Sequence, residues 1–536
     1  MYQIYPLGTP GQGGGGFFGG VPATNDLTSP PETKLLLLRH WYTHLKELGV
    51  TSIYFSPLFE SETHGYDTVD YFLIDRRVGD LASFKTILKE LHELGIKVIL
   101  DGVFNHTGRQ FFAFQEIIKA GKDWANCPFK DWYFISEGNS TYDDPFAYRS
   151  WEGHEELPEL NVENEAVREY LFKVAKFWLG EVGVDGWRLD VAHELPPAFW
   201  RDFRTACTEA NPEHVLLGEV IHGDYNVWVG PSKGLLHSGT NYQLSKALWS
   251  STKEHNFYEL DSAVTRDNMM YREMSLVNFL SNHDVARVAT QLEGEPQHNR
   301  IAHFLLLTSR GIPCIYYGDE VGIKGRKEEG DAALRQAMVN PDPASGEWPP
   351  GGKELFDFIS ALVKFRALHP ALVDGSHHPL YCGKGEYGMA NNEIVFARRA
   401  EGEVLIVAAN ADKEHTHVEV FMGHLDKAPG TPLVGIWGDG ADCGCINDEY
   451  KVRIHLPPYG CRIFSLGDLP PAPEAEPPAQ AEGSNAEPHI VLASDAGTPA
   501  PQADASQADA PAPAVLAPVT DDGEPYVPYV PGTSLP

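Results

Sequence analysis

Carboxylate residues stand at or just after the ends of four short apolar runs, each about the length of a β-strand. The four residues are Asp101, Asp190, Glu219 and Asp284. Two carboxyl groups in one site can cleave a glycosidic bond, because an ionised one attacks the sugar while a protonated one gives its proton to the leaving oxygen. The pattern therefore indicates glycosyl chemistry, with no sign of a serine nucleophile elbow or an HExxH zinc motif.

Three basic side chains lie close in sequence to these carboxylates. Arg188, two residues before Asp190, would favour the ionised form of that carboxyl group. A proton on Glu219 would be favoured by burial or by nearby anions. His106 and His283 could donate hydrogen bonds to sugar hydroxyls. Any one of these residues could instead cap a helix or form a structural ion pair, but four such strand ends in one chain favour an active site.

The elements that must position these residues alternate along the first part of the chain. Tyr2–Tyr5 and Val98–Val103 have the pattern of buried strands, whereas Lys34–Leu48 and Leu81–Leu94 have helical apolar spacing. Such alternation predicts parallel strands joined by crossover helices. Periodicity alone fits both a doubly wound sheet and a closed (β/α)₈ barrel, and a barrel would collect catalytic groups at the C-terminal ends of its strands.

The character of the chain changes near residue 373. Four strand patterns separated by turns predict a small all-β domain, at Glu393–Arg398, Glu403–Ala409, His417–Phe421 and Val452–Leu456. Residues 468–536 are rich in Pro and Ala, contain no Lys or Arg, and carry many carboxylates. We expect this acidic tail to be disordered because it holds too little apolar surface to fold alone.

Composition narrows the possible partners and the compartment. The formal net charge of −33 disfavours binding to nucleic acid or to an anionic membrane surface. No run of 18 apolar residues predicts a transmembrane helix. The seven cysteines are an odd number and the first residues lack the pattern of a secretory signal, so we expect a cytoplasmic protein.

Four segments, in order, resemble the conserved regions of the α-amylase family, glycoside hydrolase family 13. They are Asp101–His106, Gly186–Glu194, Gly218–Val220 and Phe279–Asp284. The resemblance implies a catalytic (β/α)₈ TIM barrel over residues 1–372 with an inserted domain at about 107–161. It also implies a C-terminal all-β sandwich over residues 373–467.

The same resemblance assigns roles to individual residues. It implies Asp190 as the nucleophile, Glu219 as the general acid/base, and Asp284 as the carboxylate that binds and distorts the reacting sugar. The substrate-binding residues that it implies are Tyr66, His106, Arg188, His283 and Arg335.

Within the family, two segments resemble the neopullulanase, cyclomaltodextrinase and maltogenic amylase group. They are Val191–Glu194 and Leu157–Asn161. The group implies hydrolysis of α-1,4-glucosidic bonds in maltodextrins, with an α-glucan oligosaccharide as the partner. A glucanotransferase, or a non-catalytic glucan-binding protein on the same scaffold, is the alternative. The group's N-terminal β-domain has no counterpart before Tyr2, which leaves cyclodextrin preference and oligomeric state open.

A metal is not expected. The calcium site of secreted amylases uses a histidine one place after the position of His193, where this chain has Glu194. The resemblance therefore implies no cofactor, although Asn105, which also matches that calcium site, is present.

Removing the acidic tail should leave the catalytic part intact. Truncation after Gly467 should leave the melting temperature and the turnover on maltodextrin nearly unchanged, because the tail carries too few large apolar residues to contribute a core. Thermal melting and product assays of the two forms test this. A large loss in either quantity would show that the tail docks onto the rest of the chain.

Overall fold

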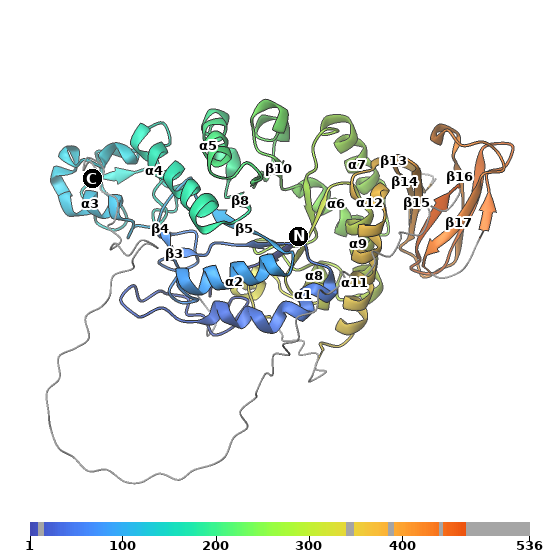
Figure 1. Ribbon diagram of the computed structural model, residues 1–536, viewed down its shortest axis with the longest axis horizontal. Helices are drawn as coiled ribbons and strands as arrows, with labels where there is room; N and C mark the ends of the chain where they lie inside the picture. The colour runs from blue at the N-terminus through green and yellow to red at the C-terminus, as the bar shows by residue number, and fades with distance from the viewer. Residues whose placement is uncertain (9–14, 339–347, 384–390, 439–442, 468–536) are drawn as a thin grey trace, which may run out of the picture. The chain divides into compact units, whose positions relative to one another are not determined.

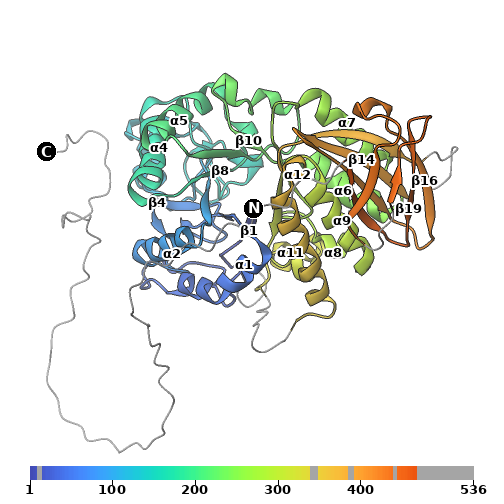
Figure 2. The same cartoon turned by 45° about the vertical axis from the view of Figure 1, so that its right-hand side comes forward.

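The computed structural model describes residues 1–8, 15–338, 348–383, 391–438 and 443–467 (Figures 1 and 2). The predicted disordered tail, 468–536, lies outside the described residues. In the part of the chain that is described, no helix has the length and apolar character needed to cross a membrane.

Eight parallel strands form the sheet at the centre of the catalytic part, in the order β10-β9-β8-β5-β2-β1-β12-β11. Thr240, directly after β10, pairs in parallel with Val277 of β11, so the two edges of the sheet meet. The closed (β/α)₈ barrel is therefore confirmed over the doubly wound alternative. The strands are β1 (Tyr2–Ile4), β2 (Ser52–Phe55), β5 (Lys97–Gly102), β8 (Gly186–Leu189), β9 (Val215–Gly218), β10 (Ser238–Gly239), β11 (Val277–Phe279) and β12 (Ile312–Tyr316).

Helices connect the strands and pack outside them. In the first long one, α2 (Leu81–Glu93), Asp80 and Ser83 form a reciprocal capping box, and Phe84, Ile87 and Leu91 bury one face. The other main helices are α1 (Tyr42–Leu48), α4 (Glu165–Lys176), α5 (Pro197–Ala210), α6 (Tyr242–Lys253), α7 (Tyr258–Met270), α8 (Val288–Gln291), α9 (Pro296–Thr308), α11 (Gly352–Leu368) and α12 (Pro370–Val373).

Part of the predicted helix Lys34–Leu48 is wrong in type. Residues Lys34–Trp41 form a 3₁₀-helix, η1, and only Tyr42–Leu48 are α-helical. The buried side chains of η1 are Leu35, Leu38 and Trp41. This spacing of three matches the three residues per turn of a 3₁₀-helix, so the apolar pattern fits the tighter helix at least as well.

A long insertion follows β5 and ends before α4. It contains helix α3 (Phe112–Ala120) and a short hairpin of β6 (Ile135–Ser136) and β7 (Ala147–Tyr148). A bridge between His106 and Glu159 holds the start and the end of the insertion together beside the barrel. A second hairpin, β3 (Phe59–Ser61) and β4 (Thr68–Ile74), follows β2 and carries Tyr66 in its turn.

The C-terminal part is an all-β domain of a six-stranded antiparallel sheet and a two-stranded ribbon, β16–β19. Both views show it beside α7, α9 and α12 (Figures 1 and 2). Four of its strands were not predicted from the sequence: β13, β17, β18 and β20. Bulges interrupt β13 and β17. The strands are β13 (Ser376–Cys382), β14 (Glu393–Ala400), β15 (Glu403–Asn410), β16 (Thr416–Phe421), β17 (Pro432–Trp437), β18 (Cys443–Cys445), β19 (Lys451–Leu456) and β20 (Cys461–Leu466). The domain limits given above stay a prediction.

Two buried arginines bind the C-terminal end of α9, and one of them, Arg398, joins the β-domain to the barrel. Arg398 of β14 donates to the carbonyl oxygens of Thr308 (2.5 Å) and Gly375 (2.9 Å), and burial lowers the pKa of its guanidinium to about 9. Arg366 of α11 donates to the carbonyls of Leu307 (2.7 Å) and Gly311 (2.9 Å). Both cations thus bind carbonyls at the C-terminal end of α9, where a helix favours positive charge.

Candidate active site

The four carboxylates lie at one mouth of the barrel, because the C-terminal ends of parallel barrel strands meet there. Asp101 is the last but one residue of β5, Asp190 follows β8, and Glu219 follows β9. Asp284 stands on the loop after β11. The structure therefore brings together the side chains that the sequence placed at separate strand ends.

Arg188 binds three of these carboxylates at once. Its Nη1 lies 2.9 Å from Asp101 Oδ1 and 2.8 Å from Asp190 Oδ1, while Nη2 lies 2.8 Å from Glu219 Oε1. The arginine side chain is only 3% exposed, so water screens these contacts little. One buried cation thus holds the candidate nucleophile and the candidate acid close together.

Burial dominates the electrostatics of this cluster. It raises the pKa of Asp190 well above the usual range and raises that of Asp101, while the charge of Arg188 acts in the opposite direction. The predicted effect of Arg188 on Asp190 therefore has the expected sign, but desolvation and the neighbouring anions outweigh it.

Glu219 is held on both of its carboxylate oxygens. Tyr242, the first residue of α6, donates its hydroxyl to Oε1 at 2.9 Å, and the backbone N–H of Val191 donates to Oε2 at 3.1 Å. Val191 takes up φ = 36°, a left-handed conformation that is strained for a β-branched residue. That strain is consistent with a backbone amide turned toward a functional carboxylate.

The site contains two polar groups. The first is Arg188 with its three carboxylates, and the second is Asp284 with Arg335 and His283. Oδ1 of Asp284 lies 3.0 Å from Arg335 Nη2, and Oδ2 lies 3.0 Å from His283 Nε2. Burial would raise the pKa of Asp284, but the positive charges of His283, Arg335 and Arg188 hold it well below the usual range. At 39% exposure, this is the most open of the four carboxylates.

Tyr66 connects the two polar groups. Its ring stacks on His283 with centroids 5.5 Å apart and planes 7° apart, and its hydroxyl hydrogen-bonds His283 Nε2. The same hydroxyl lies 3.4 Å from Asp101 Oδ2. The predicted binding residues Tyr66, His283 and Arg335 thus contact the carboxylates directly.

His106 lies in the same mouth but keeps one ring nitrogen unused. The side chain is buried, its Nε2 has no hydrogen-bond partner among the described residues, and the ring of Trp151 lies 5.9 Å away. Burial lowers the pKa of His106 to about 3, so the imidazole is neutral. A neutral ring nitrogen beside an aromatic face is suited to a sugar hydroxyl.

Sequence reasoning missed three polar residues of the site. Tyr242 binds Glu219, Tyr54 donates to Asp101 at 3.0 Å, and Gln3 bonds His283 Nδ1 at 2.8 Å. Tyr54 and Gln3 lie inside strands, where their residue types could have indicated inward polar groups. No spacing in the sequence relates Tyr242 to Glu219.

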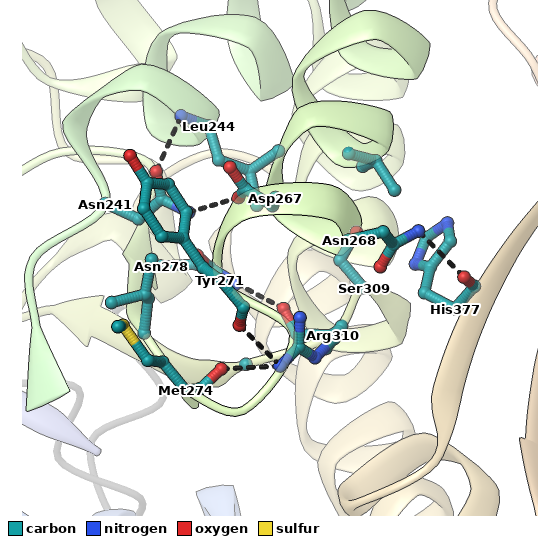
Figure 3. A pocket seen from close by; sticks show the side chains of 13 residues that line it. Asn241, Leu244, Asp267, Asn268, Tyr271, Met274, Asn278, Ser309, Arg310 and His377 are labelled. Carbon is teal, nitrogen blue, oxygen red and sulfur yellow. Dashed lines mark hydrogen bonds between the residues drawn. The ribbon is translucent and has the colours of Figure 1, made fainter. Parts of the chain in front are cut away.

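A separate pocket lies toward the N-terminal ends of the strands (Figure 3). It is lined by Leu276 before β11, Gly311 before β12 and His377 of the β-domain, together with Asn241 and Asp267. None of the four carboxylates lines it. In the described ranges no group of three or more His, Cys, Asp or Glu is placed to hold a metal ion, and the expectation of no cofactor stays a prediction.

Comparison with known proteins agrees with this architecture. The model of the α-amylase catalytic domain matches residues 42–347. A cyclomaltodextrinase from Bacillus sp. is 35% identical over 410 residues, which cover 73% of this chain and 68% of the relative. Neopullulanase 2 from Thermoactinomyces vulgaris is 38% identical over 344 residues, which cover 62% of this chain and 55% of the relative.

A solved structure extends the likeness to the β-domain. The debranching enzyme of Nostoc punctiforme superimposes with a TM-score of 0.70 at 28% identity, covering 87% of this chain and 97% of that one. The matched family model spans more than half of the chain, and the barrel carries the carboxylates expected at its mouth. The protein therefore belongs to the α-amylase family and is a glycoside hydrolase.

Proposed function

We propose that this enzyme hydrolyses α-1,4-glucosidic bonds in maltodextrins, with retention of anomeric configuration. The observation that carries the proposal is the buried Arg188, which binds Asp190 and Glu219 at 2.8 Å each. Two carboxyl groups held so close together suit the double-displacement route. The names of the relatives, a cyclomaltodextrinase and a neopullulanase, support short α-glucans as substrates.

In the first step, Asp190 attacks the anomeric carbon as the bond from that carbon to the leaving oxygen breaks. Arg188 binds Oδ1 of Asp190, which leaves Oδ2 to form the new bond. Glu219 transfers its proton to the leaving oxygen. In the second step, water gives a proton to Glu219 and its oxygen to the sugar, and Asp190 leaves as a carboxylate.

The remaining residues bind the sugar around the reacting bond. Asp284, with Arg335 and His283 beside it, presents a carboxylate to the hydroxyls of the reacting ring. His106 offers its unused nitrogen to a further hydroxyl, and Tyr66 supplies an aromatic face. These groups are fixed before substrate arrives, which suits them to stabilise a developing positive charge.

We also propose that the enzyme works in the cytoplasm, on glucans already short enough to enter a cell. The odd number of cysteines supports a reducing compartment. Free thiols are found at Cys127, Cys207, Cys314, Cys382, Cys445 and Cys461. Detection of the protein in the cytosolic fraction of its source cells would test this.

Replacing Asp190 by Asn should remove nearly all activity without unfolding the barrel. The amide keeps the size and hydrogen-bonding capacity of the side chain but cannot attack the sugar, so turnover of maltoheptaose should fall by about 10⁴-fold or more. Chromatography of the products and a thermal melt of both forms provide the measurement. Near-normal turnover by the variant would refute the nucleophile assignment.

The wild-type products of that assay separate the alternative functions. A hydrolase gives chains shorter than maltoheptaose. A glucanotransferase gives chains longer than maltoheptaose, and a glucan-binding protein gives no products.

The first product released should be the α-anomer. Two inversions at one carbon return the starting configuration, and a covalent intermediate on Asp190 requires two. Proton NMR of a fresh reaction, recorded before mutarotation, shows which anomer appears first. Initial release of the β-anomer would contradict the proposed double displacement.

A further inference from the structure

Tyr242, which the sequence did not single out, contacts the proposed acid/base Glu219. Its hydroxyl lies 2.9 Å from Glu219 Oε1 and 3.0 Å from the side-chain nitrogen of Asn282. The hydroxyl therefore has two neighbours, and the direction of each hydrogen bond decides what Tyr242 does to Glu219.

Asn282 settles that direction. Its side-chain oxygen accepts the backbone N–H groups of Asp284 (2.8 Å) and Val285 (3.1 Å), which identifies that atom as the carbonyl oxygen. The amide NH₂ must then face Tyr242 and donate to its hydroxyl oxygen. The hydroxyl hydrogen remains for Glu219, and burial keeps it in place because it raises the pKa of Tyr242 well above the usual range.

The position of Tyr242 is fixed by the start of its helix. Asn241 caps α6 by accepting the N–H of Leu244 at 3.1 Å and donates to Asp267 Oδ2 of α7 at 2.6 Å (Figure 3). The backbone N–H of Asn241 donates to the carbonyl of Val277 in β11 at 2.8 Å. The Tyr242 ring packs edge-on against Phe279 with centroids 4.9 Å apart.

Among the described residues, Oε1 of Glu219 thus receives two donors, the Tyr242 hydroxyl and Arg188 Nη2, whereas Oε2 receives only the N–H of Val191. We propose that Tyr242 is a positioning residue that occupies Oε1 of Glu219, so that Oε2 is the oxygen that passes the proton to and from the substrate. This inference rests on the proposed role of Glu219 as the acid/base.

The proposal has an electrostatic consequence. A donor on Oε1 stabilises the carboxylate that forms when the proton leaves, so it assists proton donation to a poor leaving group. The other charged or titratable groups that face Glu219 remain in place in a Tyr242 variant; they are Arg188, Asp190, Asp101, Tyr54 and His193.

The test is Tyr242→Phe, which keeps the ring and removes only the hydroxyl. On maltotriose, whose leaving group needs the proton, kcat/KM should fall roughly 10- to 100-fold, the range of a hydrogen bond to a charged group. On α-maltosyl fluoride, whose fluoride leaves with little acid assistance, kcat/KM should change less than threefold. The basic limb of the maltotriose pH profile should move to higher pH, because a carboxylate that loses a hydrogen-bond donor is protonated more readily.

Tyr42→Phe is the matched control. Tyr42 also donates its hydroxyl to a carboxylate, Glu90 Oε2 at 2.8 Å, but both residues lie on outer helices of the barrel. In this variant, kcat/KM on both substrates and the pH profile on maltotriose should equal those of the wild type.

Equal losses on the two substrates with an unmoved basic limb, or no loss on either, would overturn the role of Tyr242. In both cases an active wild type leaves the proposed function standing. A wild type that cleaves neither substrate overturns the proposed function and this inference with it.

Discussion

A single buried guanidinium serves three carboxylates, and the site depends on this arrangement. Removing Arg188 would leave Asp101, Asp190 and Glu219 buried together without their cation, which is among the most costly changes that a protein interior can suffer. The barrel makes the arrangement possible because β5, β8 and β9 are neighbours whose ends deliver one carboxylate each. Fold and chemistry are therefore linked through Arg188.

The second polar group, Asp284 with Arg335 and His283, also lies at the mouth of the barrel. Asp284 pairs with Arg335 and His283, so this carboxylate stays ionised in a place where burial raises the pKa of Asp190. Tyr66 joins the two groups through His283 and Asp101, which makes the mouth one connected hydrogen-bonded network.

The barrel and the meeting of the four carboxylates at its mouth could be predicted from the sequence. Parallel barrel strands place their C-terminal ends together, so a carboxylate at the end of each apolar run had to lie near the others. Tyr242 could not be placed in that way, since its contact with Glu219 depends on where α6 starts. The 3₁₀-helix η1 was misread because its buried residues, three apart, also fit an α-helix. The bulged strands β13 and β17 lacked the unbroken alternation that identifies a strand.

The most direct test of the account is to trap the sugar on the enzyme. With Glu219→Gln and α-maltosyl fluoride, fluoride can leave without an acid, but water is not activated to release the sugar. If Asp190 is the nucleophile, the trapped protein should be heavier by one maltosyl group, with the label on the peptide that contains Asp190. A label on Asp101 or Asp284, or none while fluoride is released at a steady rate, would contradict the account.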